Sequence, residues 1–155
     1  MKYEVVNLTE KTVVGLTART NNASPDMGAV IGGLWGRFFG IYSAISQKAN
    51  DKTLGIYTDY ASDEHGDYTV MTACEVASAD TVPTHAVSKT IPAGRYAKFV
   101  VQGPMQAAVA EFWRQLWAMS LPRSYVCDFE EYQNADPENA IVHIYIGLKD
   151  ESEKA

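Results

Sequence analysis

Residues 124–133, "SYVCDFEEYQ", decide how this chain can fold. Apolar and polar side chains alternate through them, which favours a β-strand whose successive side chains point to opposite faces of a sheet. Two adjacent glutamates, Glu130 and Glu131, break the pattern between Phe129 and Tyr132. One glutamate therefore points to the same side as the apolar residues and the other to the opposite side. Which of them faces a binding site is the question that the rest of the sequence has to answer.

The next apolar segment, 140–149, is joined to this stretch by turn residues at 134–139. The two segments are predicted to form a β-hairpin. One face of the second strand is uniformly aliphatic, and we expect it to pack against a helix: Val142, Ile144, Ile146 and Leu148. Cys127, Phe129 and Glu131 share one face of the first strand. We expect that face to lie on the same helix side, with Glu131 reaching solvent where the strand ends.

The opposite face of the predicted hairpin then faces a ligand trough. Its members are Glu130, Tyr132, His143 and Tyr145. A carboxylate among aromatic rings suits an organic cation, because a desolvated cation–π contact contributes about 1–2 kcal/mol. A partly buried carboxylate also attracts a cation more strongly than a hydrated one does. Alternation alone leaves a second interpretation open, in which Glu130 is an ordinary solvated strand residue.

The order of elements in the second half repeats that of the first half. The predicted strands lie at 3–20, with a kink or hairpin turn near "TEK" at 9–11, and at 53–60, 68–76, 90–103, 125–133 and 140–149, and the predicted helices lie at 29–46 and 104–121. Both helices carry a related signature, "LWGRFF" at 34–39 and "FWRQLW" at 112–117. A connector at 77–89 separates the halves. The chain therefore reads as an internal duplication of a strand–helix–hairpin unit.

This duplication predicts an α+β fold made of two βαββ units, with pseudo-repeats at 1–78 and 88–150 of a single domain over 1–155. The two units are expected to join into one antiparallel sheet with two long helices on one face. A ligand cavity is expected at their junction. Three tryptophans at helical spacing, Trp35, Trp113 and Trp117, have two open interpretations: core packing, or a flat surface for a planar guest.

Bulk composition is that of a globular protein with a sizeable core, at 155 residues, 46% hydrophobic and 21% charged. A net charge of −6 without a cluster of Lys and Arg argues against a nucleic-acid partner. No signal peptide and no membrane-spanning stretch are expected. Cys74 and Cys127 are interpreted as buried free thiols, which favours a cytoplasmic location. The histidines are scattered, so neither a metal nor another cofactor is expected.

The ordered set of motifs resembles the GyrI-like small-molecule-binding superfamily over almost the whole chain. The residues that carry the resemblance are "LWGRFF", "AGRYAKFVVQG" at 93–103, "FWRQLW", and "DFEEY" at 128–132 followed by "AIVHIYIGL" at 140–148. The chain is most similar to stand-alone effector-binding proteins, akin to the ligand domains of AraC-type and multidrug-responsive regulators and to integron-associated proteins. The resemblance implies a duplicated βαββ fold with a central ligand cavity.

The resemblance also implies roles for individual residues. The motif's glutamate, here Glu130, is implied to contact cationic or polar aromatic ligands in the central cavity. Tyr145, on the following strand, is implied to line the same cavity, and Thr58 and Tyr68 are implied contributions of the first half. Regulators of this kind carry a DNA-binding domain for which this chain has no room. Any regulatory role is therefore expected to act by sequestering a ligand or through a protein partner.

Three functions are consistent with these features. The first is binding of amphipathic aromatic or cationic small molecules, and it is the function we predict. The second is hydrolysis of cyclopropane-bearing DNA-alkylating natural products, with Glu130 as general base. The third is inhibition of a macromolecular target through a protein–protein contact. The predicted ligand-binding residues are Glu130, Tyr145, Tyr132, His143, Trp113, Trp117, Trp35, Phe39, Thr58 and Tyr68.

Overall fold

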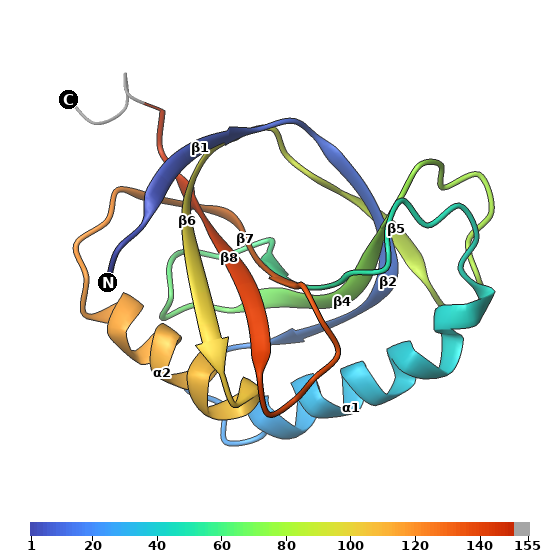
Figure 1. Cartoon of the computed structure of the whole chain (residues 1–155), viewed down its shortest axis with the longest axis horizontal. Coiled ribbons are helices and arrows are strands. Elements are labelled where there is room, and N and C mark those ends of the chain that lie inside the picture. The colour runs from blue at the N-terminus through green and yellow to red at the C-terminus, as the bar shows by residue number, and fades with distance from the viewer. Residues whose placement is uncertain (151–155) are drawn as a thin grey trace.

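A computed structural model describes residues 1–150, and residues 151–155 of the predicted domain lie outside it. The described chain forms an eight-stranded antiparallel sheet and two α-helices (Figure 1). The strands are β1 Glu4–Leu8, β2 Lys11–Thr20, β3 Thr53–Thr58, β4 Tyr68–Val76, β5 Val87–Ile91, β6 Gly94–Gly103, β7 Arg123–Tyr132 and β8 Ala140–Leu148. The helices are α1 Met27–Ile41 and α2 Met105–Trp117, and a 3-10 turn, η1 Tyr42–Ala44, follows α1.

Two βαββ units make up the sheet, as the sequence predicted. The first runs β2–α1–β3–β4 and the second β6–α2–β7–β8, and the strand order is β1-β6-β8-β7-β3-β4-β2-β5. The units join where β3 pairs with β7. Both helices lie on the same side of the sheet (Figure 1). The predicted α+β fold with one antiparallel sheet and two helices is confirmed.

Several predicted element boundaries differ from those of the structure. The segment 3–20 divides into β1 and β2 at the expected break near 9–11, but the two strands lie far apart in the sheet instead of forming a kinked strand or a hairpin, because β1 crosses over to pair with β6. The strand expected at 90–103 likewise divides into β5 and β6. The helix expected at 29–46 begins at Met27 and ends at Ile41. β5 pairs with β2 at the opposite edge of the sheet, so part of the predicted connector is strand.

Each helix buries one apolar stripe on its own unit. α1 buries Leu34 and Phe38, and α2 buries Phe112 and Leu116, in each case one helical turn apart. The α1 pair packs with residues of β2 and β4, and the α2 pair packs with residues of β6 and β8. The buried stripes of the two helices therefore pack beside the two central strands, β3 and β7, and not on top of them. These central strands lie along the junction between the units.

The far face of the sheet, turned away from the helices, is also a core. Its buried members are Val13, Leu54, Ile56, Met71, Ala73, Ile91, Tyr96, Cys127, Phe129 and Tyr145. Val6 and Leu8 of β1 pack against this cluster. Figure 1 shows the chain from β1 to β2 arching over this side of the sheet. A sheet that is buried on both faces has apolar residues at odd and even positions alike.

The expected assignment of faces in β7 and β8 is wrong for β7. Directly opposite residues of an antiparallel pair share a face. Glu130 lies opposite Ile144, so it is on the helix face, whereas Phe129 lies opposite Tyr145 on the far face. Glu131 and Cys127, each two residues from Phe129 along the strand, lie on the far face with it. The expectation failed because both faces of this hairpin are apolar, so the aliphatic set of β8 does not reveal which face of β7 accompanies it.

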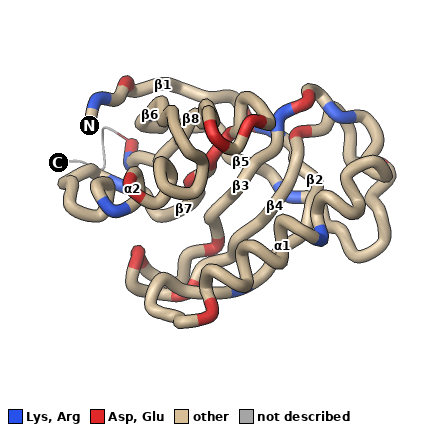
Figure 2. The backbone as a smooth tube through the Cα atoms, turned by 60° about the horizontal axis from the view of Figure 1, so that its bottom comes forward, with Lys and Arg blue, Asp and Glu red and all other residues tan. Residues whose placement is uncertain are grey.

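Charged residues are spread over the whole molecule. Figure 2 shows lysine and arginine scattered singly along the backbone, rather than gathered along one element. That distribution is not the basic stripe typical of proteins that bind a phosphate backbone. Within residues 1–150, no helix has the length and apolar character needed to cross a bilayer.

Candidate functional site

A buried carboxylate lies at the centre of the helix face. Glu130, near the end of β7, is only 2% exposed. Its Oε2 accepts hydrogen bonds from the indole Nε1–H of Trp113 at 2.7 Å and from the hydroxyl of Tyr57 at 3.1 Å. Its Oε1 accepts one from the hydroxyl of Tyr132 at 2.7 Å. The two central strands and α2 thus position three aromatic donors around one acid.

The charge of this carboxylate is not neutralised by its partners. Burial raises the pKa of Glu130, and the hydrogen bonds from Trp113, Tyr132 and Tyr57 oppose that rise without cancelling it. Burial and the nearby carboxylate also raise the pKa values of Tyr57 and Tyr132, so both hydroxyls remain protonated donors. All three donors are uncharged. Because burial disfavours the charged form of this carboxyl group, a positive charge placed beside it would favour ionisation.

The internal duplication explains this arrangement. Tyr57 lies two residues after Gly55 on β3, and Tyr132 lies two residues after Glu130 on β7. The indole of Trp113 packs edge-on against Tyr57 with ring centroids 5.3 Å apart. In the same way, Trp35, at the matching position of the α1 signature, packs edge-on against Tyr132 at 5.5 Å. The site is therefore built from two equivalent Trp–Tyr pairs.

Glycine and glutamate occupy the two equivalent positions between these pairs. Gly55 and Glu130 are direct partners in the β3–β7 ladder. A Cβ atom added to Gly55 would lie 3.0 Å from Oε1 of Glu130 and 3.4 Å from a ring carbon of Trp35. Such contacts are tighter than ordinary packing, so the missing side chain of Gly55 provides the space that the carboxylate fills.

A groove opens beside this acid on the α1 side, with a volume of about 690 Å³. Its residues come from α1, η1, the loop before β3 and the start of that strand, the start of α2, and the end of β7 with the turn that follows: Gly32, Trp35, Phe39, Tyr42, Asp51, Thr53, Met105, Gln106, Tyr132, Gln133, Asn134, Ala135, Asp136 and Pro137. Phe39 stacks on Trp35 and is 58% exposed. Tyr132 lines the groove while donating its hydroxyl to Glu130, so it separates the groove from the carboxylate.

A much smaller cavity of about 20 Å³ lies at the corresponding place on the α2 side. It is lined by Asn22, Tyr57, Tyr60, Glu64, Tyr68, Trp113, Trp117 and Arg123. Tyr57, Trp113 and Trp117 are the counterparts of Tyr132, Trp35 and Phe39 in the groove. The two hollows are therefore equivalent halves of one duplicated site, of which one is open and the other almost filled.

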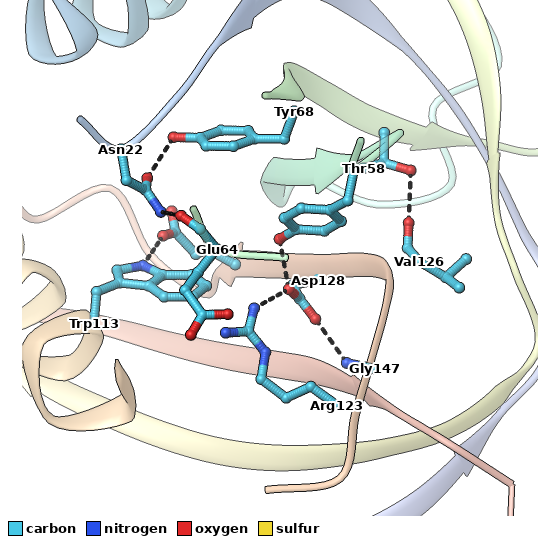
Figure 3. Close-up of polar contacts among 11 residues, drawn as sticks. Asn22, Thr58, Glu64, Tyr68, Trp113, Arg123, Val126, Asp128 and Gly147 are labelled. Carbon is cyan, nitrogen blue, oxygen red and sulfur yellow. Dashed lines mark hydrogen bonds and ion pairs between the residues drawn. The ribbon is translucent and has the colours of Figure 1, made fainter. Parts of the chain in front are cut away.

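A buried ion pair supports the floor of the small cavity. Oδ2 of Asp128 accepts hydrogen bonds from the hydroxyl of Tyr60 at 2.6 Å and from the guanidinium of Arg123 at 2.8 Å, and Oδ1 accepts one from the backbone N–H of Gly147 at 2.8 Å (Figure 3). Burial raises the pKa of Tyr60 well above its ordinary value, so the phenol remains a donor. The charges of Arg123 and Asp128 are therefore paired with each other, and the pair holds Arg123 in place at the edge of the cavity.

Most of the predicted site residues lie on the helix face, around the two hollows: Glu130, Tyr132, Trp35, Phe39, Tyr68, Trp113 and Trp117. Three do not. Tyr145 stacks on Phe129 in the far-face core, with ring centroids 4.7 Å apart. His143 lies opposite Glu131 on that same face. Thr58 donates its hydroxyl to the backbone carbonyl of Val126. The expectation that these three share a cavity with Glu130 is wrong, because strand alternation places them on the other face.

Sequence reasoning also missed residues that the structure brings to the site. Tyr57, the third donor to Glu130, occupies the repeat position that matches Tyr132, so alignment of the two halves could have identified it. Glu64 comes from the hairpin turn at 61–67, which gave no sign of folding back over the site. Arg123 and Glu64 both line the small cavity. Within residues 1–150, no group of three or more His, Cys, Asp or Glu side chains could hold a metal ion.

Comparisons with known proteins agree with this architecture. The family model described as GyrI-like small molecule binding domain matches residues 1–149. An integron cassette protein from the mobile metagenome of Vibrio cholerae is 27% identical, with a TM-score of 0.79 and 95% of each chain covered. The structure of SAV2435 bound to tetraphenylphosphonium is 21% identical, with a TM-score of 0.80 and coverage of 99% of this chain and 97% of that one. No curated protein matches the chain.

A further solved structure comes from a larger protein. It is a cryo-EM structure of an EcmrR–DNA complex, 14% identical with a TM-score of 0.63. The alignment covers 96% of this chain and 58% of that one. At this level of identity, the similarity concerns the fold alone.

Proposed function

Because this chain belongs to the GyrI-like small molecule binding domain family, we propose that its ligands are amphipathic aromatic cations and that Glu130 selects their charge. The observation that carries the proposal is one carboxylate, buried among three neutral aromatic donors, beside an open aromatic groove. Such a group attracts an organic cation in surroundings of low dielectric constant, where water screens the charge least.

The groove has the size and lining that this class of ligand requires. Small-molecule sites are typically clefts of roughly 300–1,000 Å³ lined by aromatic and apolar side chains, and the groove has about 690 Å³. Trp35 and Phe39 stack at 5.7 Å with their ring planes 25° apart, which gives a flat aromatic wall. A cation lying over such a face gains a cation–π contact of about 1–2 kcal/mol.

The route from the groove to Glu130 passes Tyr132. A ligand in the groove meets this phenol ring first, because Tyr132 both lines the groove and donates to Oε1 of Glu130. Displacement of that hydroxyl frees one carboxylate oxygen for the cation, while Trp113 and Tyr57 retain the other. The ligand thereby replaces a neutral donor with a positive charge.

One similar structure supports the ligand class. SAV2435, whose fold this chain shares, was solved bound to tetraphenylphosphonium, a lipophilic aromatic cation. We take that compound as the probe for this chain. Binding of such a cation, followed by sensing or sequestration, is the role that we propose.

Hydrolysis by Glu130 is less compatible with the site. A general base needs a free lone pair within hydrogen-bond reach of a water molecule. Here three hydrogen bonds from aromatic donors occupy most of the roughly four lone-pair sites of the carboxylate, and Tyr132 separates Oε1 from the groove. Inhibition of a macromolecular target has no specific observation in its favour. Ligand binding is therefore the single function that we propose.

The proposal is tested by tryptophan fluorescence titration with tetraphenylphosphonium. Glu130→Gln keeps the shape of the side chain and removes its charge, and we expect it to weaken binding at least about tenfold. Glu131→Gln is the matched control, because this neighbouring acid lies on the far face. We expect the control to bind like the parent. Equal affinity in all three proteins would refute the role of Glu130, and no saturable quenching in the parent would refute the ligand class.

A further inference from the structure

The small cavity on the α2 side contains two buried polar atoms that lack a hydrogen-bond partner. In the part of the chain that the structure describes, these are Nε of Arg123 and Oε2 of Glu64. Both residues line the cavity. Buried polar groups in proteins almost always have a partner. One unused N–H donor and one unused carboxylate acceptor beside the same cavity therefore indicate a missing group that can satisfy both.

The donor is held in a fixed position. Arg123 is 7% exposed, and its guanidinium donates to Asp128 at 2.8 Å. The same guanidinium lies over the ring of Tyr125, 4.4 Å from its centroid. These contacts leave the Nε–H no freedom to seek another acceptor. Its direction is set before any ligand arrives.

The backbone of Glu64, the residue that carries the acceptor, is also held, by different residues. The side-chain amide of Asn22 donates to the backbone carbonyl of Glu64 at 3.0 Å, and the hydroxyl of Tyr68 donates to Asn22 at 2.9 Å (Figure 3). A hydrogen bond from Tyr125 and the charge of Arg123 lower the pKa of Glu64. The Glu64 carboxylate is thus ionised at neutral pH, and Oε2 acts only as an acceptor.

The cavity lies next to the proposed cation site. Tyr57 and Trp113 line it, and both donate to Oε2 of Glu130. A single layer of aromatic rings therefore separates the cavity from the carboxylate. An arm on a ligand bound at Glu130 reaches the cavity when the edge-on contact between Tyr57 and Trp113, whose ring centroids lie 5.3 Å apart, opens to admit it.

We propose that this cavity is a second, hydroxyl-sized subsite, which binds a hydroxyl group of the ligand between Arg123 and Glu64; this inference rests on the proposed function. A hydroxyl accepts from Nε–H and donates to Oε2 at the same time. An ether or alkyl group cannot donate, an ammonium cannot accept, and a carboxylate would meet a like charge. About 20 Å³ matches one such group, since a cavity needs roughly 10–15 Å³ to hold a water molecule.

The subsite narrows the ligand class from aromatic cations to aromatic cations that carry a polar arm. When the ligand has no such arm, one water molecule can make the same two hydrogen bonds. A hydroxyl that displaces this water reproduces both bonds, which is the condition under which displacement of an ordered water does not weaken binding. The covalent link to the cation then makes the second contact intramolecular.

The test compares matched probes. A series of ω-hydroxyalkyl triphenylphosphonium salts is titrated by calorimetry beside the alkyl salts that lack the hydroxyl. We expect the hydroxyl to increase affinity about fivefold at the best chain length. In Glu64→Ala we expect the ratio of hydroxyalkyl to alkyl affinity to drop to about twofold or less, while the affinity of the alkyl salts stays the same. Asp80→Ala, which removes an exposed acid of the connector, is the control and should keep the full advantage.

The outcomes separate this inference from the proposed function. If the alkyl salts bind in a Glu130-dependent way but no chain length favours the hydroxyl, the subsite is refuted and the proposed function stands. An advantage that persists in Glu64→Ala also refutes it. If no phosphonium salt binds, the proposed function fails. A high-resolution crystal structure then decides on the polar subsite: a water bridging Nε and Oε2 supports it, and a dry cavity refutes it.

Discussion

Glu130 and Gly55 are direct partners on the central strands β7 and β3, and the Glu130 carboxylate occupies the space that a side chain at Gly55 would need. They hold equivalent positions in the two halves of the duplication, each followed two residues later by a tyrosine that donates to the same carboxylate. A duplicated site would have two such acids at hydrogen-bonding distance. Like charges that close cannot both ionise, so a glycine at one position removes a repulsion that would favour protonation of the other.

Gly55→Ala should therefore damage the site directly. The new Cβ would lie 3.0 Å from Oε1 of Glu130, and the carboxylate cannot shift without lengthening the hydrogen bonds from Trp113 and Tyr132 that hold it. We expect tetraphenylphosphonium affinity to fall by about tenfold or more, and stability by about 1–3 kcal/mol from overpacking. Gly36→Ala on α1 is the control, because nothing lies within 4 Å of its added Cβ. The control should raise stability by up to about 1 kcal/mol through helix propensity.

Trp113→Phe should show how much the indole hydrogen bond contributes to the free energy of unfolding. It removes a 2.7 Å donor from a buried carboxylate, and the loss of a bond to a charged group costs about 1.5–3 kcal/mol. Trp35→Phe makes the same change in the equivalent Trp–Tyr pair, where the indole packs on Tyr132 instead of donating to Glu130. Denaturant unfolding should show Trp113→Phe to be the more destabilised variant. Equal losses in the two variants would mean that packing, and not the hydrogen bond, explains the cost.

Cation affinity should depend on pH through Glu130. Burial raises its pKa in the folded state above the ordinary value of 4.5. Only the ionised carboxylate attracts a permanent cation, so affinity should fall as the pH drops through this raised pKa. Because a single proton is involved, the affinity should change by at most about tenfold per pH unit. Calorimetry of tetraphenylphosphonium binding across pH measures it in the parent, and Glu130→Gln should show a nearly flat profile over the same range. A parent profile as flat as that of the variant would contradict the assignment.

The buried ion pair beneath the small cavity should matter more for stability than for binding. Asp128→Asn leaves the Arg123 guanidinium buried without its anion, and loss of one partner of a buried pair costs about 3–5 kcal/mol. Asp59→Asn breaks a largely exposed pair with Lys89 and should cost less than about 1 kcal/mol. The two free energies of unfolding are compared under one condition. A cost below that of Asp59→Asn would show that the Arg123–Asp128 pair does not hold the cavity wall.

The fold could be predicted because its information is local and repeated. The signatures at 34–39 and 112–117 match Leu34 with Phe112 and Trp35 with Trp113, and the members of each pair pack in equivalent places, although only Trp113 donates to Glu130. The pairing of two strands joined by a short turn can be predicted from the neighbouring sequence alone. The crossover of β1 to β6 could not be predicted, because it depends on a distant edge that no local pattern describes.

The site was predictable only in part, for a different physical reason. Alternation indicates which residues of one strand share a face, but not which face meets a helix when both are apolar. Tyr145 was therefore grouped with Glu130, although its ring stacks on Phe129 in the far-face core. Glu64 lay beyond prediction, since its place in the small cavity depends on how the turn at 61–67 docks against Asn22.

The central claim, that a single dry anion selects positively charged aromatic guests, is tested most directly by reversing the charge of the guest without changing its shape. Tetraphenylphosphonium and tetraphenylborate are nearly identical in size and opposite in charge, and calorimetry measures the affinity of each for the unmodified chain. We expect the phosphonium to bind at least about a hundredfold more tightly, because the borate would place a like charge beside Glu130. Equal affinities for the two ions would contradict the account.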